Sequence, residues 1–82
     1  MKYRIEISKQ AQKFIARQPK TQQLRILSAI KKLPYEGDIK QMRGYENRFR
    51  LRIGDYRAIY SKYDNILLID VMNIGNRGDI YK

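Results

Sequence analysis

The chain has 82 residues, the size of one small domain, and we expect a single domain over 1–82 with no membrane-spanning segment. Its 18 Lys and Arg against 8 Asp and Glu give a net charge of +10, which indicates a polyanionic partner, either nucleic acid or an acidic protein. The sequence contains no Cys and no His, which excludes disulfides, thiolate chemistry and the usual general base and metal ligand, so we expect no metal and no cofactor.

The first expected element is a half-buried strand, because Tyr3, Ile5 and Ile7 alternate with charged residues. The N-terminal residues lead into this strand and not into a signal-peptide core, so we expect a cytoplasmic protein. Ser8 is suited to cap a helix, and apolar residues at helical spacing predict a short helix over 9–17.

A second helix is expected to begin with Pro19 at its first helical position and to end before Pro34. One apolar stripe faces the core in this prediction: Ile26, Ala29, Ile30 and Leu33. Leu24 lies off the stripe and is expected to contact either the first helix or a partner. Residues 35–44 read as a polar connector punctuated by two glycines.

Residues 47–60 show the alternating pattern of a hairpin, and Gly54-Asp55 suits a type II′ turn between its two strands. This turn fixes the expected pairs: Ile53 with Tyr56, Arg52 with Arg57, Leu51 with Ala58, Arg50 with Ile59 and Phe49 with Tyr60. Since paired residues share a face, one face is apolar. The opposite one, which we call the arginine face, carries Arg48, Arg50, Arg52 and Arg57.

Two interpretations of the arginine face stay open. Like charges opposite each other cost stability, and residues two apart on a strand are about 6.5 Å apart, which resembles the stride between phosphates of an extended nucleic-acid strand. Guanidinium groups are also well shaped for phosphate. These points favour an anion site, whereas the alternative is an ordinary solvated sheet face.

The nearly continuous apolar run 66–74 predicts a last strand covered on much of both sides. A two-residue turn at Asp64-Asn65 would place Ile69 beside Tyr60 and Val71 beside Ala58. Asp70 would then lie on the arginine face, two strands across from Arg50. The expected order is β-α-α-β-β-β, an α+β fold with a mainly antiparallel four-stranded sheet and two helices packed on one face.

Two segments carry a family resemblance. Residues 47–60 resemble the central hairpin of the RelE/ParE superfamily of type II toxin–antitoxin toxins, and residues 71–81 resemble its C-terminal motif, in which a strand ends at Gly75 and is followed by Arg77 and Tyr81. The RelE branch implies an endoribonuclease, or mRNA interferase, that cuts mRNA in the ribosomal A site and so inhibits translation. It also implies a cognate acidic, RelB-like antitoxin, contact with 16S rRNA, and a toxin–antitoxin complex that binds operator DNA through the antitoxin.

The resemblance assigns roles to individual residues. Arg48 and Arg50 fall on positions that contact the RNA backbone, and Arg52 matches a further basic position. The catalytic positions fall on Arg57, Arg77 and Tyr81. Many relatives carry His where this chain has Asn76, which can hydrogen-bond but cannot take up a proton at neutral pH.

Cleavage by attack of a 2′-OH on the adjacent phosphate needs a base, a stabiliser of the growing charge and a proton for the leaving oxygen. Arginines can supply the electrostatic stabilisation. A tyrosine has an ordinary pKa of about 10, so Tyr81 acts as a base only if neighbouring arginines favour its phenolate. A stacking or packing role for Tyr81 remains the alternative.

Two other functions compete with the nuclease. A ParE-like toxin poisons DNA gyrase without chemistry, and the gyrase-directed branch typically lacks this basic cluster. A plain RNA-binding sheet would expose aromatic pairs for stacking, whereas Tyr56 and Tyr60 face the core in the expected register.

Overall fold

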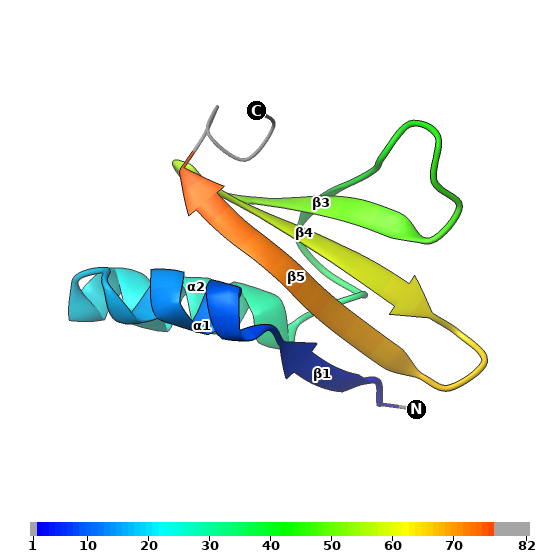
Figure 1. The fold of residues 1–82 in the computed structure, drawn as a ribbon, viewed down its shortest axis with the longest axis horizontal. Helices are drawn as coiled ribbons and strands as arrows, with labels where there is room; N and C mark the ends of the chain where they lie inside the picture. The colour runs from blue at the N-terminus through cyan, green and yellow to red at the C-terminus, as the bar shows by residue number, and fades with distance from the viewer. Residues whose placement is uncertain (1, 77–82) are drawn as a thin grey trace.

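The computed structural model describes residues 2–76, which form two helices and a five-stranded sheet (Figure 1). Its elements are β1 (Arg4–Ile7), α1 (Lys9–Ala16), α2 (Lys20–Lys31), β2 (Asp38–Gln41), β3 (Arg48–Ile53), β4 (Tyr56–Tyr63) and β5 (Leu68–Asn76). The strand order is β1-β5-β4-β3-β2, with β1 parallel to β5 and every other pair antiparallel. No helix within residues 2–76 is long and apolar enough to cross a membrane.

The first strand and helix agree with the sequence prediction. The Ser8 side chain accepts a hydrogen bond from the Ala11 amide at 3.0 Å, so it caps α1 as expected. The same hydroxyl donates to the Met72 carbonyl at 2.8 Å. One residue therefore starts the helix and ties it to β5.

The start of α2 and the connector after it differ from the prediction. Pro19 is the N-cap and not the first helical residue, because its extended ψ of 151° leaves its carbonyl to accept from the first-turn amides of Gln22 and Gln23. The expected connector contains β2, so the sheet has five strands and not four. This edge strand has one apolar residue, Ile39, in four, which is too short a pattern to show a period.

The helices lie together against one face of the sheet (Figure 1). Their buried side chains pack on the apolar side of the strands, and the core consists of Ala11, Ile15, Ile26, Ile30, Leu33, Leu51, Ile53, Ala58, Tyr60, Ile69, Val71 and Ile74. Leu24 is 61% exposed, so most of its side chain is left open to solvent or a partner instead of being covered by α1.

The hairpin register is confirmed at all five predicted pairs. Gly54 has a φ of +58° and Asp55 does not have a positive φ, as a type II′ turn requires. Phe49 stacks on Tyr60 on the apolar side, with ring centroids 5.5 Å apart. The arginine face is therefore the side of β3 and β4 that faces away from the helices.

The predicted pairing of β4 with β5 is wrong, by two residues at Tyr60 and by three at Ala58. The strands are joined by residues 64–67, and Tyr60 pairs with Val71 while Ala58 pairs with Ile74. The register also shifts between Ile59 and Tyr60, at a β-bulge that a pattern of alternation cannot reveal.

As a result, Asp70 pairs with Ser61, which pairs with Arg48 on the other side. Asp70 thus lies two strands across from Arg48 and not from Arg50. Its neighbours Ile69 and Val71 are core residues, so the side chain of Asp70 is on the predicted face of the sheet.

Candidate functional site

The arginine face is built by the alternation of β3 and the tight turn that follows it. Arg52 pairs directly with Arg57 across the hairpin, and Arg50 and Arg48 follow at two-residue steps along β3. Arg52 is exposed, and the other three are half-buried. Backbone geometry thus directs four guanidinium groups to one side of two neighbouring strands.

The edge strand β2 adds two charges to this face that the sequence prediction lacked. Lys40 pairs with Arg50, and Asp38 pairs with Arg52. Asp38 is exposed, and no ion pair joins it to Arg52 within the described part of the chain. The face therefore remains strongly cationic, with Asp38 at its β2 margin and Asp70 at its β5 margin.

Between the arginines the sheet surface is closed to solvent. Ile59, opposite Arg50, is 8% exposed, and Ser61, opposite Arg48, is 2% exposed. The Ser61 hydroxyl lies 3.5 Å from the Met72 sulfur. The cationic side chains therefore lie beside a surface that excludes water, where charge–charge attraction is stronger than in open water.

Arg48 is held by a neighbouring aromatic ring. Its guanidinium carbon lies 4.2 Å from the ring centroid of Tyr45, which is the distance of a cation–π contact. Its Nε atom is buried and has no hydrogen-bond acceptor within residues 2–76. The side chain thus keeps a fixed position while its hydrogen-bonding capacity is incompletely used.

The end of β5 borders the same face. Gly75 pairs with Arg57, and Asn76, the last described residue, pairs with Tyr56. The two remaining predicted site residues, Arg77 and Tyr81, lie outside the described residues. The structure therefore brings Arg48, Arg50, Arg52 and Arg57 together and does not test the other two.

One groove opens beside the arginine face and another opens beside α1. The larger, of about 710 Å³, is lined by Lys40, Gln41, Met42, Arg43, Gly44, Tyr45 and Arg50. The smaller, of about 380 Å³, lies between α1 and β5 and is lined by Gln10, Lys13, Phe14, Arg17 and Ile74. Sequence reasoning missed the larger groove because Lys40 and Arg43 come from the segment predicted as a connector, and Tyr45 directly follows that segment. Their only signal was a cluster of basic and aromatic residues.

Outside the arginine face, Tyr3, Tyr60 and Asp64 have pKa values that are shifted by their surroundings. Burial raises the pKa of Tyr60 to about 12, so its phenol stays protonated. The Tyr3 hydroxyl donates to Asp64 at 2.6 Å, which raises the pKa of Tyr3 to about 12 and lowers that of Asp64. Among residues 2–76 no cluster of three or more carboxylates could hold a metal ion.

Comparisons with known proteins agree on one family. A family model described as ParE toxin of type II toxin-antitoxin system, parDE, matches residues 5–81. A chain in the crystal structure of the archaeal RelE–RelB complex from Pyrococcus horikoshii OT3 is 32% identical, with a TM-score of 0.83 over 96% of this chain and 99% of that one. No curated protein sequence matched.

Two more solved structures show the same fold. A chain of the RelB–RelE antitoxin–toxin complex from Methanococcus jannaschii is 26% identical, with a TM-score of 0.73 over 92% of this chain and 93% of that one. The isolated E. coli RelE toxin is 19% identical, with a TM-score of 0.72 over 96% of this chain and 90% of that one. At this lower identity the likeness shows the fold alone.

Proposed function

The chain belongs to the RelE/ParE superfamily, as a toxin of a type II toxin–antitoxin system with a RelE-like fold, and from this premise we propose that it is an mRNA endoribonuclease acting in the ribosomal A site. The observation that carries the proposal is the arginine face. Arg52 and Arg57 stand directly opposite each other, and Arg50 and Arg48 extend the row. A phosphate backbone is the natural counter-ion of such a row.

In the proposed reaction the 2′-oxygen of one nucleotide attacks the adjacent phosphorus, and the bond to the 5′-oxygen breaks. Arg48, Arg50 and Arg52 hold the backbone phosphates along β3. Arg57 and Arg77 stabilise the charge that grows on the phosphoryl oxygens, usually the largest catalytic contribution. The products are a cyclic 2′,3′-phosphate and a 5′-hydroxyl, so no metal or cofactor enters the balance.

Two protons move in this scheme. A base accepts the proton of the attacking 2′-OH, and an acid gives one to the leaving 5′-oxygen. Tyr81 is the proposed group for one of these transfers or for stacking on a base beside the cleaved bond. Asn76 sits at the end of β5 beside Tyr56 and contributes a hydrogen bond rather than a proton.

We propose a cognate RelB-like antitoxin as the physiological partner. Two of the similar structures are complexes of RelE with RelB. A net charge of +10 favours an acidic segment that neutralises the toxin, and a complex of this kind would reach operator DNA through the antitoxin. When free, the toxin would contact mRNA and 16S rRNA on the ribosome.

One observation favours a second candidate, a gyrase poison without catalysis. The description of the matching family model names the ParE toxin. The row of arginines on β3 and β4 supports the nuclease instead, because phosphate binding gives each of these side chains a role. The identity of 32% to the RelE–RelB structure supports the same choice.

The two candidates are separated by incubating the purified protein with translating ribosomes and mapping the 5′ ends of the mRNA. The nuclease predicts new ends within A-site codons. Intact mRNA together with gyrase-dependent DNA breaks or stalled replication would contradict it and support the gyrase poison. Ribosomes without the protein give the background of ends.

A further inference from the structure

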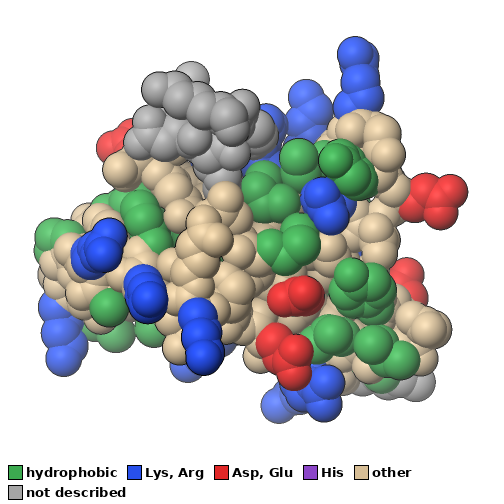
Figure 2. Space-filling view, in the orientation of Figure 1, with side chains coloured by type: hydrophobic (Ala, Val, Ile, Leu, Met, Phe, Trp, Pro, Cys, Tyr) green, Lys and Arg blue, Asp and Glu red, His purple; other side chains and the backbone are tan. Residues whose placement is uncertain are grey.

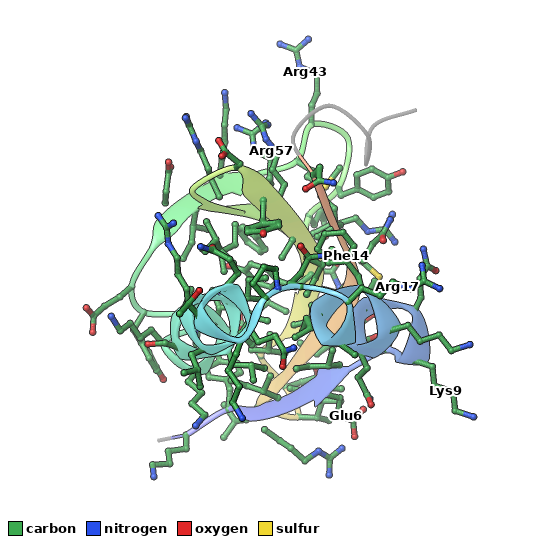
Figure 3. The ribbon with its side chains drawn as sticks, turned by 90° about the vertical axis from the view of Figure 1, so that its left-hand side faces the viewer. Glu6, Lys9, Phe14, Arg17, Arg43 and Arg57 are labelled. Carbon is green, nitrogen blue, oxygen red and sulfur yellow. The ribbon has the colours of Figure 1, made fainter. Side chains whose placement is uncertain are left out.

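The larger of the two grooves lies beside the arginine face, between the loop that joins β2 to β3 and the side chain of Arg50. Three cations line it, namely Lys40, Arg43 and Arg50, together with the aromatic ring of Tyr45. Figure 3 shows Arg43 and Arg57 reaching toward the same side of the molecule, away from Glu6 on β1. The groove thus extends the cationic surface of the arginine face, so that one extended ligand could contact both.

The loop that forms one wall is pinned at several points. The Gln41 side-chain amide donates to the carbonyls of Tyr45 at 3.0 Å and Glu46 at 2.8 Å. The Met42 amide donates to the Arg48 carbonyl at 2.9 Å, and the Lys62 amide donates to the Asn47 carbonyl at 2.8 Å. These bonds fix where Tyr45 stands, so the wall is preorganised before any ligand arrives.

Tyr45 is the one aromatic in this wall, and it is 46% exposed. The guanidinium of Arg48 lies over its ring at 4.2 Å. A large aromatic held in place by a cation and left half open beside other cations resembles the stacking platforms of proteins that bind single-stranded nucleic acid. Burial of apolar surface in the core gives no reason for this placement.

The lining of the groove favours RNA over an antitoxin helix as the occupant. The side chains of the groove include three cations and no carboxylate, and its only apolar members are Met42 and Tyr45. An amphipathic antitoxin helix would need a row of apolar anchors, which this lining does not provide. A nucleotide offers one flat base and one phosphate, matching one ring and neighbouring cations.

We propose that this groove is a nucleotide subsite that holds one unpaired RNA nucleotide flanking the cleaved bond. Its base stacks on Tyr45, and its phosphate is bound among Lys40, Arg43 and Arg50. The proposal rests on the proposed ribonuclease function, because it places a further part of the same RNA strand.

The test measures binding of a short single-stranded RNA whose attacking 2′-OH is replaced by hydrogen, so that the RNA cannot be cut. Fluorescence anisotropy at low salt gives the dissociation constant for the wild-type protein and for Tyr45→Ala. We expect Tyr45→Ala to weaken binding about tenfold, the usual scale for the loss of one stacked base. Tyr45→Phe keeps the ring and should bind like the wild type. Tyr35→Ala, an exposed tyrosine outside the groove, is the matched control.

The decisive comparison repeats the measurement with RNAs that carry one abasic nucleotide at successive positions. At a single position the missing base should weaken wild-type binding and remove the difference between wild type and Tyr45→Ala. Tyr45→Leu keeps side-chain bulk without a ring and should repeat the result of Tyr45→Ala. Arg43→Gln should weaken binding of every one of these RNAs, since it removes a phosphate contact.

Three outcomes would overturn the subsite: no binding of the RNA by the wild type, equal binding by wild type and Tyr45→Leu, or a Tyr45 effect unchanged at every abasic position. If Tyr45→Ala binds RNA as the wild type does but no longer binds an acidic antitoxin peptide, the groove is a peptide site instead. Ribosome cleavage is scored separately. If the wild type cuts A-site codons and the Tyr45 variants bind RNA normally, the subsite is refuted and the proposed nuclease function is retained. If the wild type never cuts, the nuclease function is refuted.

Discussion

At the scale of single residues, the pairing of Arg52 with Arg57 is the feature that least serves the fold. Like charges opposite each other on an antiparallel ladder are destabilising. Asp38 lies on the far side of Arg52, but no ion pair forms between them in residues 2–76. In the proposed function, a bound phosphate lies between these two guanidinium groups and reduces their mutual repulsion.

The first prediction concerns Tyr60, which is 1% exposed and has a pKa raised to about 12 by burial. A raised pKa in the folded state adds stability that is complete below pH 10, the ordinary tyrosine pKa, and is lost as the pH rises through 12. Tyr60→Phe should therefore show a smaller loss of stability between these pH values than the wild type. Urea unfolding midpoints at successive pH values measure it.

Tyr63→Phe on the same strand is the control and should follow the wild type. An alkaline loss of stability that is the same in Tyr60→Phe and in the wild type would show that burial of this phenol does not cause it.

At the scale of elements, the edge strand β2 depends on a close approach of the backbone to the core. Gly37 precedes β2 with a φ of +132°, and a Cβ built there would lie 2.8 Å from Cδ1 of Leu51. Leu51 is 1% exposed and has little room to move. The strand that contributes Lys40 to the site is thus positioned by a glycine that no other residue replaces without strain.

The second prediction follows from this contact. Gly37→Ala should lower the free energy of unfolding by about 2–4 kcal/mol, from the positive φ together with overpacking against Leu51. Gly44→Ala is the matched control, because Gly44 also has a positive φ but a Cβ there would meet nothing within 4 Å. It should cost only about 1–2 kcal/mol. Equal losses in the two variants, measured by urea unfolding, would contradict the account.

The third prediction concerns the tie between the edge strand β1 and the turn after β4. The hydrogen bond from the Tyr3 hydroxyl is the main cause that lowers the pKa of Asp64 below 3.8, and Lys62 at 3.6 Å adds to it. A lowered pKa gives stability that is present above pH 3.8 and is lost as the pH falls through the lowered value. Tyr3→Phe should therefore weaken the acid dependence of stability.

The measurement compares urea unfolding midpoints of Tyr3→Phe and wild type from neutral pH to below pH 3. Tyr35→Phe serves as control, since its ring contacts Tyr3 without taking part in the bond to Asp64. If the acid limbs of wild type and Tyr3→Phe superimpose, the hydrogen bond is not what lowers the pKa of Asp64.

At the scale of the whole molecule, positive charge is not confined to the arginine face. Figure 2 shows Lys and Arg side chains also gathered along the helix layer. The helices carry several of them, including Lys9, Lys13, Lys20, Arg25 and Lys31. A net charge of +10 attracts polyanions from many directions, and in the proposed function the arginine face and its groove decide where an RNA strand binds.

The fourth prediction separates these two roles by salt. The affinity for a short uncleavable RNA should fall steeply as salt rises, because each neutralised phosphate releases counter-ions. Arg50→Gln should make the slope of log affinity against log salt shallower by about one contact, whereas Lys31→Gln on α2 should leave it nearly unchanged. Equal slopes for the two variants would show that the face makes no specific phosphate contact.

Sequence reasoning predicted the parts of the fold that depend on local pattern. Alternation and a Gly-Asp turn were sufficient for the β3–β4 register, and Ser8 was sufficient for the start of α1. The β4–β5 register was missed because four residues and not two join these strands and because a bulge shifts the register once more. The strand β2 was missed because it is held mainly by pairing with β3. The arginine face was predictable because it depends on the alternation along β3 and the turn after it. The groove beside it was not predictable because it depends on β2, which no local pattern indicates.

The most direct test of the central claim is the single-turnover rate of mRNA cleavage on ribosomes carrying a defined A-site codon, measured for the wild type, Arg57→Ala and Arg4→Ala. Arg57 is opposite Arg52 on the arginine face, whereas the exposed Arg4 pairs with Glu6 on β1. We predict a loss of about 10²–10³ in rate for Arg57→Ala and a nearly unchanged rate for Arg4→Ala. Equal rates for the folded Arg57→Ala variant and the wild type would contradict the claim that this face acts on RNA.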